Sequence, residues 1–188
     1  MCLRAATAGH LDGYRPDMHA SPPAFDSNFF KSALGRFPTG VTVITANLPG
    51  QAPVGLTVSS FNSVSLDPPL VVWSLSRNSS SLTTIQQCDR YVIHVLASDQ
   101  MMFAQRFSKG TAAQRFDGVA MTQAPNGSPR LDANCAAWFE CANKSRYEEG
   151  DHIIFVGQVE HCGRNESLPL VYHSGGYDLT PSTPSSKP

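Results

Sequence analysis

The chain has 188 residues, of which 41% are hydrophobic and 15% are charged, and its formal net charge is −1. This length and composition suit one globular domain with a buried core. The near-zero charge gives no electrostatic basis for binding nucleic acid or an anionic membrane, and no apolar run approaches the roughly 20 residues that span a bilayer.

Both ends of the chain have the composition of flexible segments. Residues 1–24 mix charged residues with prolines and lack the continuous apolar stretch of a secretory signal, so we expect a disordered extension. Residues 181–188 are rich in serine and proline and should form a flexible tail. The single folded domain is therefore expected over residues 25–180.

The five cysteines form no CxxC pair and are odd in number. In a chain without a secretory signal, this pattern predicts free thiols in a reducing, cytoplasmic compartment. Zinc sites need closely spaced Cys and His ligands, so no metal site is expected.

The first half of the predicted domain begins with a helix and continues as strands. Asp26 can cap a helix over 25–37, which carries phenylalanines at helical spacing and ends before Pro38. Branched residues predict a strand over 41–45, and Pro49-Gly50 predicts a turn. Further strands are expected at roughly 53–60, 62–66 and 69–76.

The second half alternates brief helices with strands. We expect a short helix over 79–87, an apolar strand over 91–97 and a helix over 100–108 capped by Asp99. Segment 109–134 is loop-rich, and it is the expected place for a mobile active-site or interface loop. A hairpin is predicted from a strand over 136–146, a turn over 147–151 and a returning strand over 152–161.

These elements favour a mainly β fold. Many short strands with few helices, and the absence of the GxGxxG and GxxxxGK[ST] patterns, argue against a doubly wound nucleotide-binding sheet. An antiparallel closed or split β-barrel with peripheral helices fits better. The sequence contains no internal repeat and no sign of a second domain.

Two clusters of hydroxyl residues are the strongest functional signal. The first comprises Thr57, Ser59, Ser60, Ser63 and Ser65, and the second comprises Ser74, Ser76, Arg77, Asn78, Ser79, Ser80 and Ser81. Small hydroxyl residues on strands let a flat ligand approach the backbone, and hydroxyls at a helix start suit an anion. The pair suggests one ligand with a planar end and a phosphate end. A solvated serine-rich strand and an ordinary helix cap remain the alternatives.

In the order of its motifs, the chain resembles the short-chain flavin reductase family, which has the FMN-binding split-barrel fold. The likeness covers about residues 25–179, and the matching pieces are 37–45, 55–61, 63–71, 76–82, 115–119, 150–157 and 169–173. Members of this family are reductase partners of two-component flavin monooxygenases. Two residues depart from the family pattern: His94 stands at a usual Asn and Arg130 at a usual apolar residue.

The resemblance assigns roles to both hydroxyl clusters. It implies that the polar edge of the flavin ring lies against Thr57, Ser59 and Ser60. Phe61 and Phe107 would flank the flavin or simply pack in the core. The flavin phosphate would be held by Ser76, Arg77, Asn78, Ser79 and Ser81.

The turn Gly150-Asp151-His152 is similar to the family's turn associated with the nicotinamide cofactor. Gly150 permits a tight turn, and Asp151 can fix the tautomer and orientation of the imidazole. His152 is therefore the catalytic candidate, although a solvent-facing histidine in a hairpin turn is the alternative. His173 and Tyr177 are further candidates near the site. His94, inside an apolar strand, is expected to be a core histidine with its hydrogen bonds satisfied.

The resemblance implies an NAD(P)H:flavin oxidoreductase that passes hydride from NADH or NADPH to FMN or FAD and releases reduced flavin to a monooxygenase. It also implies a homodimer with the flavin site at or near the subunit interface. The sequence has no obvious basic cluster for a 2′-phosphate, which favours NADH. The alternatives are an FMN-binding electron-transfer protein and a non-enzymatic flavin-binding module of the same fold.

Overall fold

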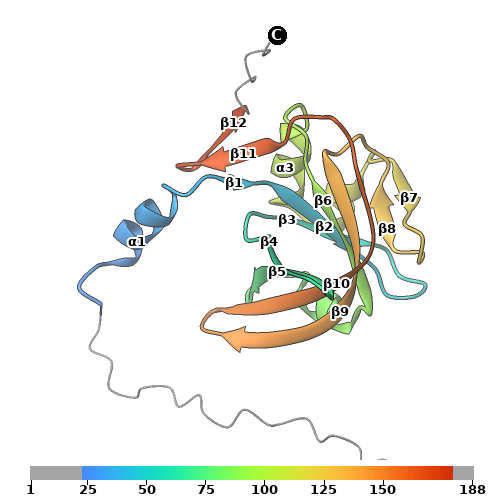
Figure 1. Ribbon diagram of the computed structural model, residues 1–188, viewed down its shortest axis with the longest axis horizontal. Helices are drawn as coiled ribbons and strands as arrows, with labels where there is room; N and C mark the ends of the chain where they lie inside the picture. Colours follow the sequence, from blue (N-terminus) through green and yellow to red (C-terminus); the bar gives the residue numbers. More distant parts are fainter. Residues whose placement is uncertain (1–22, 180–188) are drawn as a thin grey trace, which may run out of the picture.

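The computed structural model describes residues 23–179 (Figure 1). The extension expected over 1–24 lies outside the described residues except for its last two, and the tail over 181–188 lies outside them entirely. Within the described part of the chain, no helix is long and apolar enough to cross a membrane.

An antiparallel sheet curls round to form the barrel in Figure 1. Its strands are β2 (Thr42–Ala46), β3 (Val54–Val58), β4 (Asn62–Leu66), β5 (Pro69–Ser76), β6 (Arg90–Val95), β9 (Ala137–Glu149) and β10 (His152–Arg164). They are hydrogen-bonded in the order β3-β2-β6-β9-β10-β5-β4. The mainly β, antiparallel fold class predicted from the sequence is confirmed.

Smaller elements surround this sheet. A separate sheet has the order β1-β11-β12, and β7 pairs with β8; these strands are β1 (Thr39–Gly40), β7 (Met121–Gln123), β8 (Pro129–Leu131), β11 (Leu170–His173) and β12 (Gly176–Leu179). The described helices are α1 (Ser27–Leu34), α2 (Leu82–Gln87), α3 (Met101–Phe107) and α4 (Ala112–Phe116).

The structure corrects two expectations in the middle of the chain. Segment 109–134 is not only loop, because it contains α4 and the β7–β8 hairpin. Asp99 does not cap α3: the N-cap is Gln100, which makes no side-chain capping bond. Its side-chain Oε1 instead accepts from Ala97 N at 2.9 Å. Asp26 does cap α1, as expected, through bonds from Asn28 N and Phe29 N.

The β9–β10 hairpin is longer than predicted, because β9 continues to Glu149 and β10 to Arg164. The chain reverses at Gly150, whose φ of +56° lies in the left-handed region that glycine adopts without strain. Ile153, Phe155 and Gly157 share the inward face of β10, since all three are buried.

Aromatic rings fill the barrel. Trp73 on β5 stacks on Phe155 of β10 with centroids 4.5 Å apart, and it meets Tyr91 of β6 edge-on at 5.5 Å. A Cβ at Gly157 would collide with the Tyr91 hydroxyl, so only glycine leaves room for this tyrosine. A second cluster joins α3 to the sheet and includes Val43 of β2 and Phe107 of α3.

His94 joins three strands from inside the protein. Its Nδ1 lies 2.9 Å from the Val43 carbonyl, and its Nε2 accepts from Leu131 N at 3.0 Å. Because an amide N–H can only donate, the proton of the neutral ring must sit on Nδ1. Burial lowers the pKa of His94 from 6.5 to about 4. The expectation of a satisfied core histidine is confirmed.

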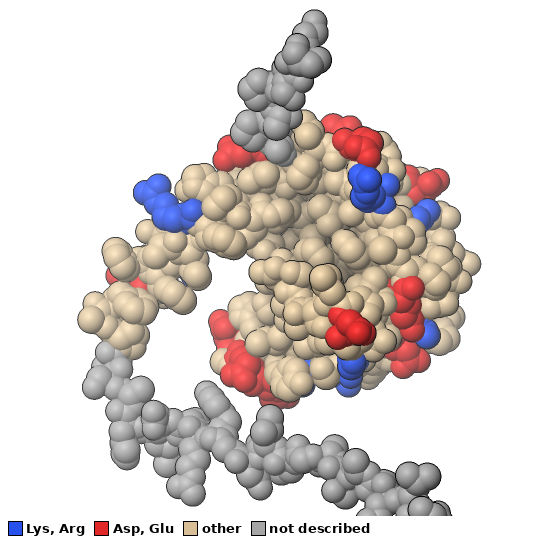
Figure 2. All heavy atoms as spheres, viewed as in Figure 1, with Lys and Arg blue, Asp and Glu red and all other residues tan. Residues whose placement is uncertain are grey.

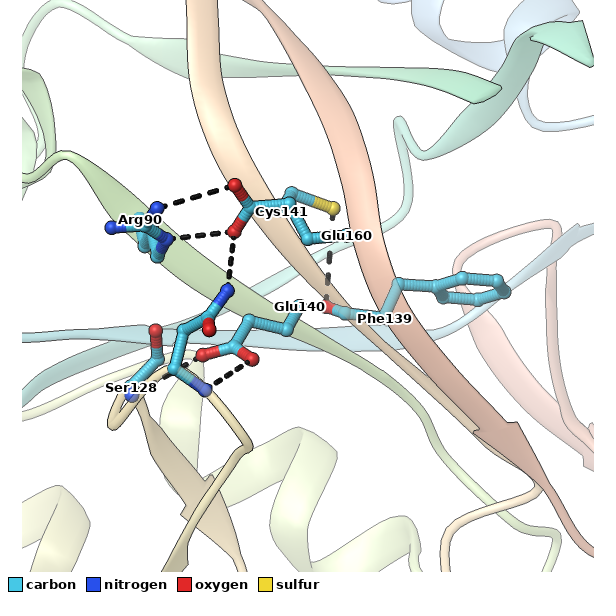
Figure 3. A network of polar contacts seen from close by, with 7 residues as sticks. Arg90, Ser128, Phe139, Glu140, Cys141 and Glu160 are labelled. Atoms are coloured by element: carbon cyan, nitrogen blue, oxygen red, sulfur yellow. Dashed lines mark hydrogen bonds and ion pairs between the residues drawn. The ribbon is translucent and has the colours of Figure 1, made fainter. Parts of the chain in front are cut away.

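Glu140 on β9 is a fully buried carboxylate that holds the β7–β8 turn against the barrel (Figure 3). Its two oxygens accept from Asn126 N at 2.9 Å and from Ser128 N at 3.3 Å. The Asn126 side chain donates to Glu160 at 2.7 Å, and Glu160 pairs with Arg90 through two bonds of 2.7 and 3.2 Å. This network orders a connection that its sequence alone suggests is mobile.

The neutral His94 predicts how stability depends on pH. The unfolded chain binds a proton near pH 6.5 and the folded chain only near pH 4, so stability falls as pH drops through this window. The loss is about 3 kcal/mol. The free energy of unfolding can be measured in urea at several pH values between 7.5 and 4.5. His94→Gln should be less stable than the wild type at pH 7, and its stability should fall less steeply as pH drops. His161→Gln, at an exposed position, should keep the wild-type slope; equal slopes in all three proteins would contradict the prediction.

Candidate functional site

The pairing of β5 with β10 brings two sequence motifs together. His152 lies opposite Ser76 in this ladder. Just beyond the end of β5, Arg77 N donates to the Asp151 carbonyl at 2.9 Å. The serine-rich turn after β5 and the Gly-Asp-His turn before β10 are therefore one continuous surface.

Asp151 orients the imidazole of His152. Its Oδ1 lies 2.7 Å from His152 Nδ1. The hydrogen bond from His152, followed by the imidazolium charge, holds the pKa of Asp151 below its ordinary value. The His152 side chain is 44% exposed, and its Nε2 bonds to no other described residue. A ligand at this surface thus meets an imidazole of fixed orientation with one nitrogen free.

The serine-rich turn is held by its own hydroxyls. Ser76 Oγ accepts from Asn78 N and Ser79 Oγ accepts from Ser81 N, both at 3.3 Å. The helix that follows begins at Leu82 and has only six residues. Its dipole therefore contributes less to binding an anion than the predicted helix over 79–87 would. Ser81 is buried, which leaves the hydroxyls of Ser76 and Ser79 nearer the surface.

Arg77 extends from this turn toward the β9–β10 hairpin. Its Nη2 lies 3.0 Å from Glu148 Oε2, and the two side chains are 43% and 68% exposed. An ion pair this exposed contributes little to stability. The guanidinium can therefore exchange Glu148 for an anionic ligand at small cost.

Of the three hydroxyls expected at the flavin ring, those of Thr57, Ser59 and Ser60, two bond within the protein. Ser60 Oγ accepts from Ser74 N at 2.9 Å and donates to the Ser74 carbonyl at 3.1 Å, which ties the β3–β4 connection to β5. Thr57 Oγ1 donates to the Ala104 carbonyl at 2.8 Å and so ties β3 to α3. Ser59 is exposed, and its hydroxyl has no partner within residues 23–179.

A cavity of about 170 Å³ opens beside these residues. It lies between β3, the end of α3 and the β11–β12 hairpin, and its lining comprises Val41, Thr57, Val58, Ser59, Ser108, Tyr172 and Tyr177. Three of the predicted site residues, Thr57, Ser59 and Tyr177, meet there. Burial raises the pKa of Tyr177, so its phenol stays protonated and can donate a hydrogen bond.

Other predicted residues lie elsewhere. Phe107 is fully buried and packs edge-on against Phe116 with centroids 5.1 Å apart, so it is a core residue that does not reach the cavity surface. Phe61 is half-buried against Phe139 at 5.6 Å. His173 does not line the cavity; its Nε2 lies 3.2 Å from Ser174 Oγ.

Sequence reasoning missed Ser108 and Tyr172, which also line the cavity. Tyr172 stands opposite Tyr177 in the β11–β12 ladder, with ring centroids 5.4 Å apart. Gly175-Gly176 is a sequence signal for a hairpin turn, and a hairpin predicted there would have placed Tyr172 opposite Tyr177. Nothing in the sequence around Ser108 indicates its position.

Comparison with known proteins relates the chain to flavin reductases. Residues 34–180 match the family model described as Flavin reductase like domain. The chain is 39% identical over 163 residues to the FMN reductase (NADH) SmoA of Agrobacterium fabrum, covering 86% of this chain and 91% of that protein. It is 35% identical to HsaB of Rhodococcus jostii, the reductase subunit of a flavin-dependent monooxygenase, over 82% of this chain and 78% of HsaB.

A solved structure has the same fold. The NADH:FAD oxidoreductase SgcE6 of Streptomyces globisporus C-1027, in complex with NAD and FAD fragments, superposes with a TM-score of 0.78. The two chains are 31% identical, and the match covers 86% of this chain and 96% of SgcE6.

The different bonding of two neighbouring serines can be tested. Ser60→Ala removes both bonds to Ser74 and should lower the free energy of unfolding by about 0.5–1.5 kcal/mol. Ser59→Ala removes a hydroxyl that has no partner among the described residues. It should change the free energy of unfolding by less than about 0.5 kcal/mol. Urea denaturation of both variants measures the difference. If Ser59→Ala lost more free energy of unfolding than Ser60→Ala, the hydrogen bonds assigned to Ser60 would be refuted.

Proposed function

Because the chain belongs to the Flavin reductase like domain family, we propose that it passes hydride from NADH to FMN or FAD at the surface joining Ser76 to His152. The observation that carries this proposal is the hydrogen-bonded contact between the serine-rich turn and the Gly-Asp-His turn. Both flavins remain in the proposal because the relatives include an FMN reductase and an NADH:FAD oxidoreductase.

The residues present fit a flavin. The Ser59 hydroxyl and the Tyr177 phenol offer hydrogen bonds for the polar edge of a ring system, and both border the same cavity. From there a ligand can follow Ser60 and Ser74 to Ser76, where hydroxyls and the exposed guanidinium of Arg77 suit a phosphate. No carboxylate lines the cavity that would receive the ring system.

A bound flavin would supply N5 as the hydride acceptor, and a bound nicotinamide would supply the hydride from C4. The chain contributes binding and orientation. Asp151 holds the His152 ring through Nδ1, so that Nε2 is available for a hydrogen bond to the nicotinamide carboxamide or to the flavin. The rate acceleration then comes mainly from holding two rings in a productive arrangement.

We further propose that the protein is a homodimer with this site near the interface. The cavity of about 170 Å³ is smaller than the roughly 300–1,000 Å³ of complete ligand pockets, so one protomer encloses only part of the ligand. Large apolar side chains on and beside α1 are between 48% and 71% exposed: Phe25, Phe29, Phe30, Leu34 and Phe37. In Figures 1 and 2 this helix stands clear of the barrel.

A second uncovered apolar surface supports the dimer. A groove of about 470 Å³ runs over the sheet beside β4, and its lining includes Phe61, Leu66, Leu70, Phe139 and Val159. Leu66 is 94% exposed. Exposed apolar surface on this scale is typical of a protein interface.

The reduced flavin is proposed to leave for a monooxygenase, as the name of the relative HsaB indicates for that protein. The described cysteines (Cys88, Cys135, Cys141 and Cys162) are all free thiols, which supports a cytoplasmic location. A non-enzymatic flavin-binding module would hold flavin without oxidising NADH, so activity separates the two functions.

NADH oxidation tests the proposed function directly. Purified protein should oxidise NADH rapidly only when FMN or FAD is added, and the rate should saturate with flavin. His152→Ala should lower kcat/KM for NADH by about 10- to 100-fold while the variant still binds flavin. His161→Ala, at an exposed position on the same strand, is the matched control. Tight flavin binding without NADH oxidation by the wild type would instead identify a binding module.

The dimer is tested by light scattering coupled to gel filtration. The wild type should elute with twice the mass of the 20.3 kDa chain. Placing charges on the exposed apolar face with Phe29→Glu and Leu34→Glu should shift it toward the monomer, because charges are costly to bury in an apolar contact. Asn28→Glu adds charge on the other side of α1 and should leave the dimer intact. A monomeric wild type at micromolar concentration would refute the proposal.

A further inference from the structure

A second cavity lies away from the proposed flavin site. It has a volume of about 200 Å³, and its lining comprises His94, Arg130, Leu131, Ala133, Cys135, Trp138 and Asn165. These residues come from β6, β8 and β9 and from the connections next to β8 and β10. The cavity shares no lining residue with the one at Thr57 and Tyr177.

Arg130 is the residue in this cavity whose bonding is incomplete. Its guanidinium lies over the Trp138 ring, with Cζ 4.7 Å from the ring centroid. Its Nε is buried and has no hydrogen-bond partner among residues 23–179, and no described carboxylate forms an ion pair with it. Buried N–H groups are nearly always paired, so an orphaned donor on a cation indicates a missing acceptor.

The other titratable groups lining the cavity are uncharged at neutral pH. Burial raises the pKa of the Cys135 thiol to about 11, so no thiolate balances the arginine. Burial lowers the pKa of His94 to about 4, and both ring nitrogens already bond to Val43 and Leu131. Arg130 is therefore the one charged side chain among the described residues that line the cavity.

We propose that this cavity binds a small carboxylate anion through Arg130. A carboxylate is flat, and it pairs with Nε–H and a terminal N–H of arginine in the plane of the guanidinium. Stacking on Trp138 occupies one face of that plane, and Arg130 lines the cavity. A cavity of about 200 Å³ admits an anion of a few heavy atoms but not a nucleotide. The site is thus independent of the proposed flavin and NADH sites.

Trp138 provides the signal for the test. The other tryptophan, Trp73, is 1% exposed inside the barrel, so a change in fluorescence on binding at Arg130 arises from Trp138. Sodium acetate is titrated into the full-length protein at pH 7.5 with fluorescence and melting temperature as readouts. Sodium chloride at equal concentrations measures general salt effects. Neither readout requires NADH or flavin.

The wild type should show a saturable change with acetate. Arg130→Leu should raise the acetate dissociation constant at least about tenfold, because it removes both donors of the charged pair. Arg130→Lys keeps the charge without the planar fork and should also bind more weakly, which preserves the test if the leucine variant folds poorly. Arg36→Leu removes an exposed arginine in the connection from α1 to β1 and should bind acetate as the wild type does.

Three results would overturn the proposal. The first is no saturable change in the wild type up to 200 mM acetate, in which case solvent alone satisfies Arg130. The second is equal acetate binding by the wild type and a folded Arg130→Leu variant. The third is an identical Arg130-dependent response to chloride, which would identify an unselective anion cavity rather than a carboxylate site.

Discussion

The register between β5 and β10 is the constraint on which both the core and the candidate site depend. The same ladder places Phe155 opposite Trp73 inside the barrel and His152 opposite Ser76 at its rim. Because side chains alternate along a strand, a slip of one residue would break the Trp73–Phe155 stack and turn His152 to the other face. The packing of the aromatic core therefore fixes where His152 lies along the ladder, and Asp151 then orients its imidazole.

Local patterns predicted much of this fold. Branched residues and turn residues indicated the strands, and β4 and β5 begin and end as expected. His94 was recognised as a core histidine because it interrupts an apolar strand. Segment 109–134 was misjudged, since the order of its hairpin depends on the buried carboxylate of Glu140, a contact with a distant strand. Polar contacts between strands leave no periodic signal in the sequence.

The hydroxyl clusters show a similar limit at the site. The sequence does not distinguish a strand serine whose hydroxyl faces a ligand from one whose hydroxyl bonds to a neighbouring backbone. Only the fold reveals that Ser60 bonds to Ser74 and that Thr57 bonds to Ala104, whereas the Ser59 hydroxyl has no partner in the described part of the chain. His94 and Arg130 were singled out separately in the sequence, and only the fold shows that they line the same cavity. Their proximity follows from the bond between His94 and Leu131, the neighbour of Arg130.

The exposed helix α1 also has a consequence for how the protein is made. It precedes every strand of the barrel in the chain, so it leaves the ribosome before any of them, and none of its residues is buried in the finished protomer. Its phenylalanines are consequently left uncovered by the rest of residues 23–179. During translation they are open to chaperones and to neighbouring nascent chains, and crowding on a polysome raises the risk of aggregation for this segment above that of the barrel.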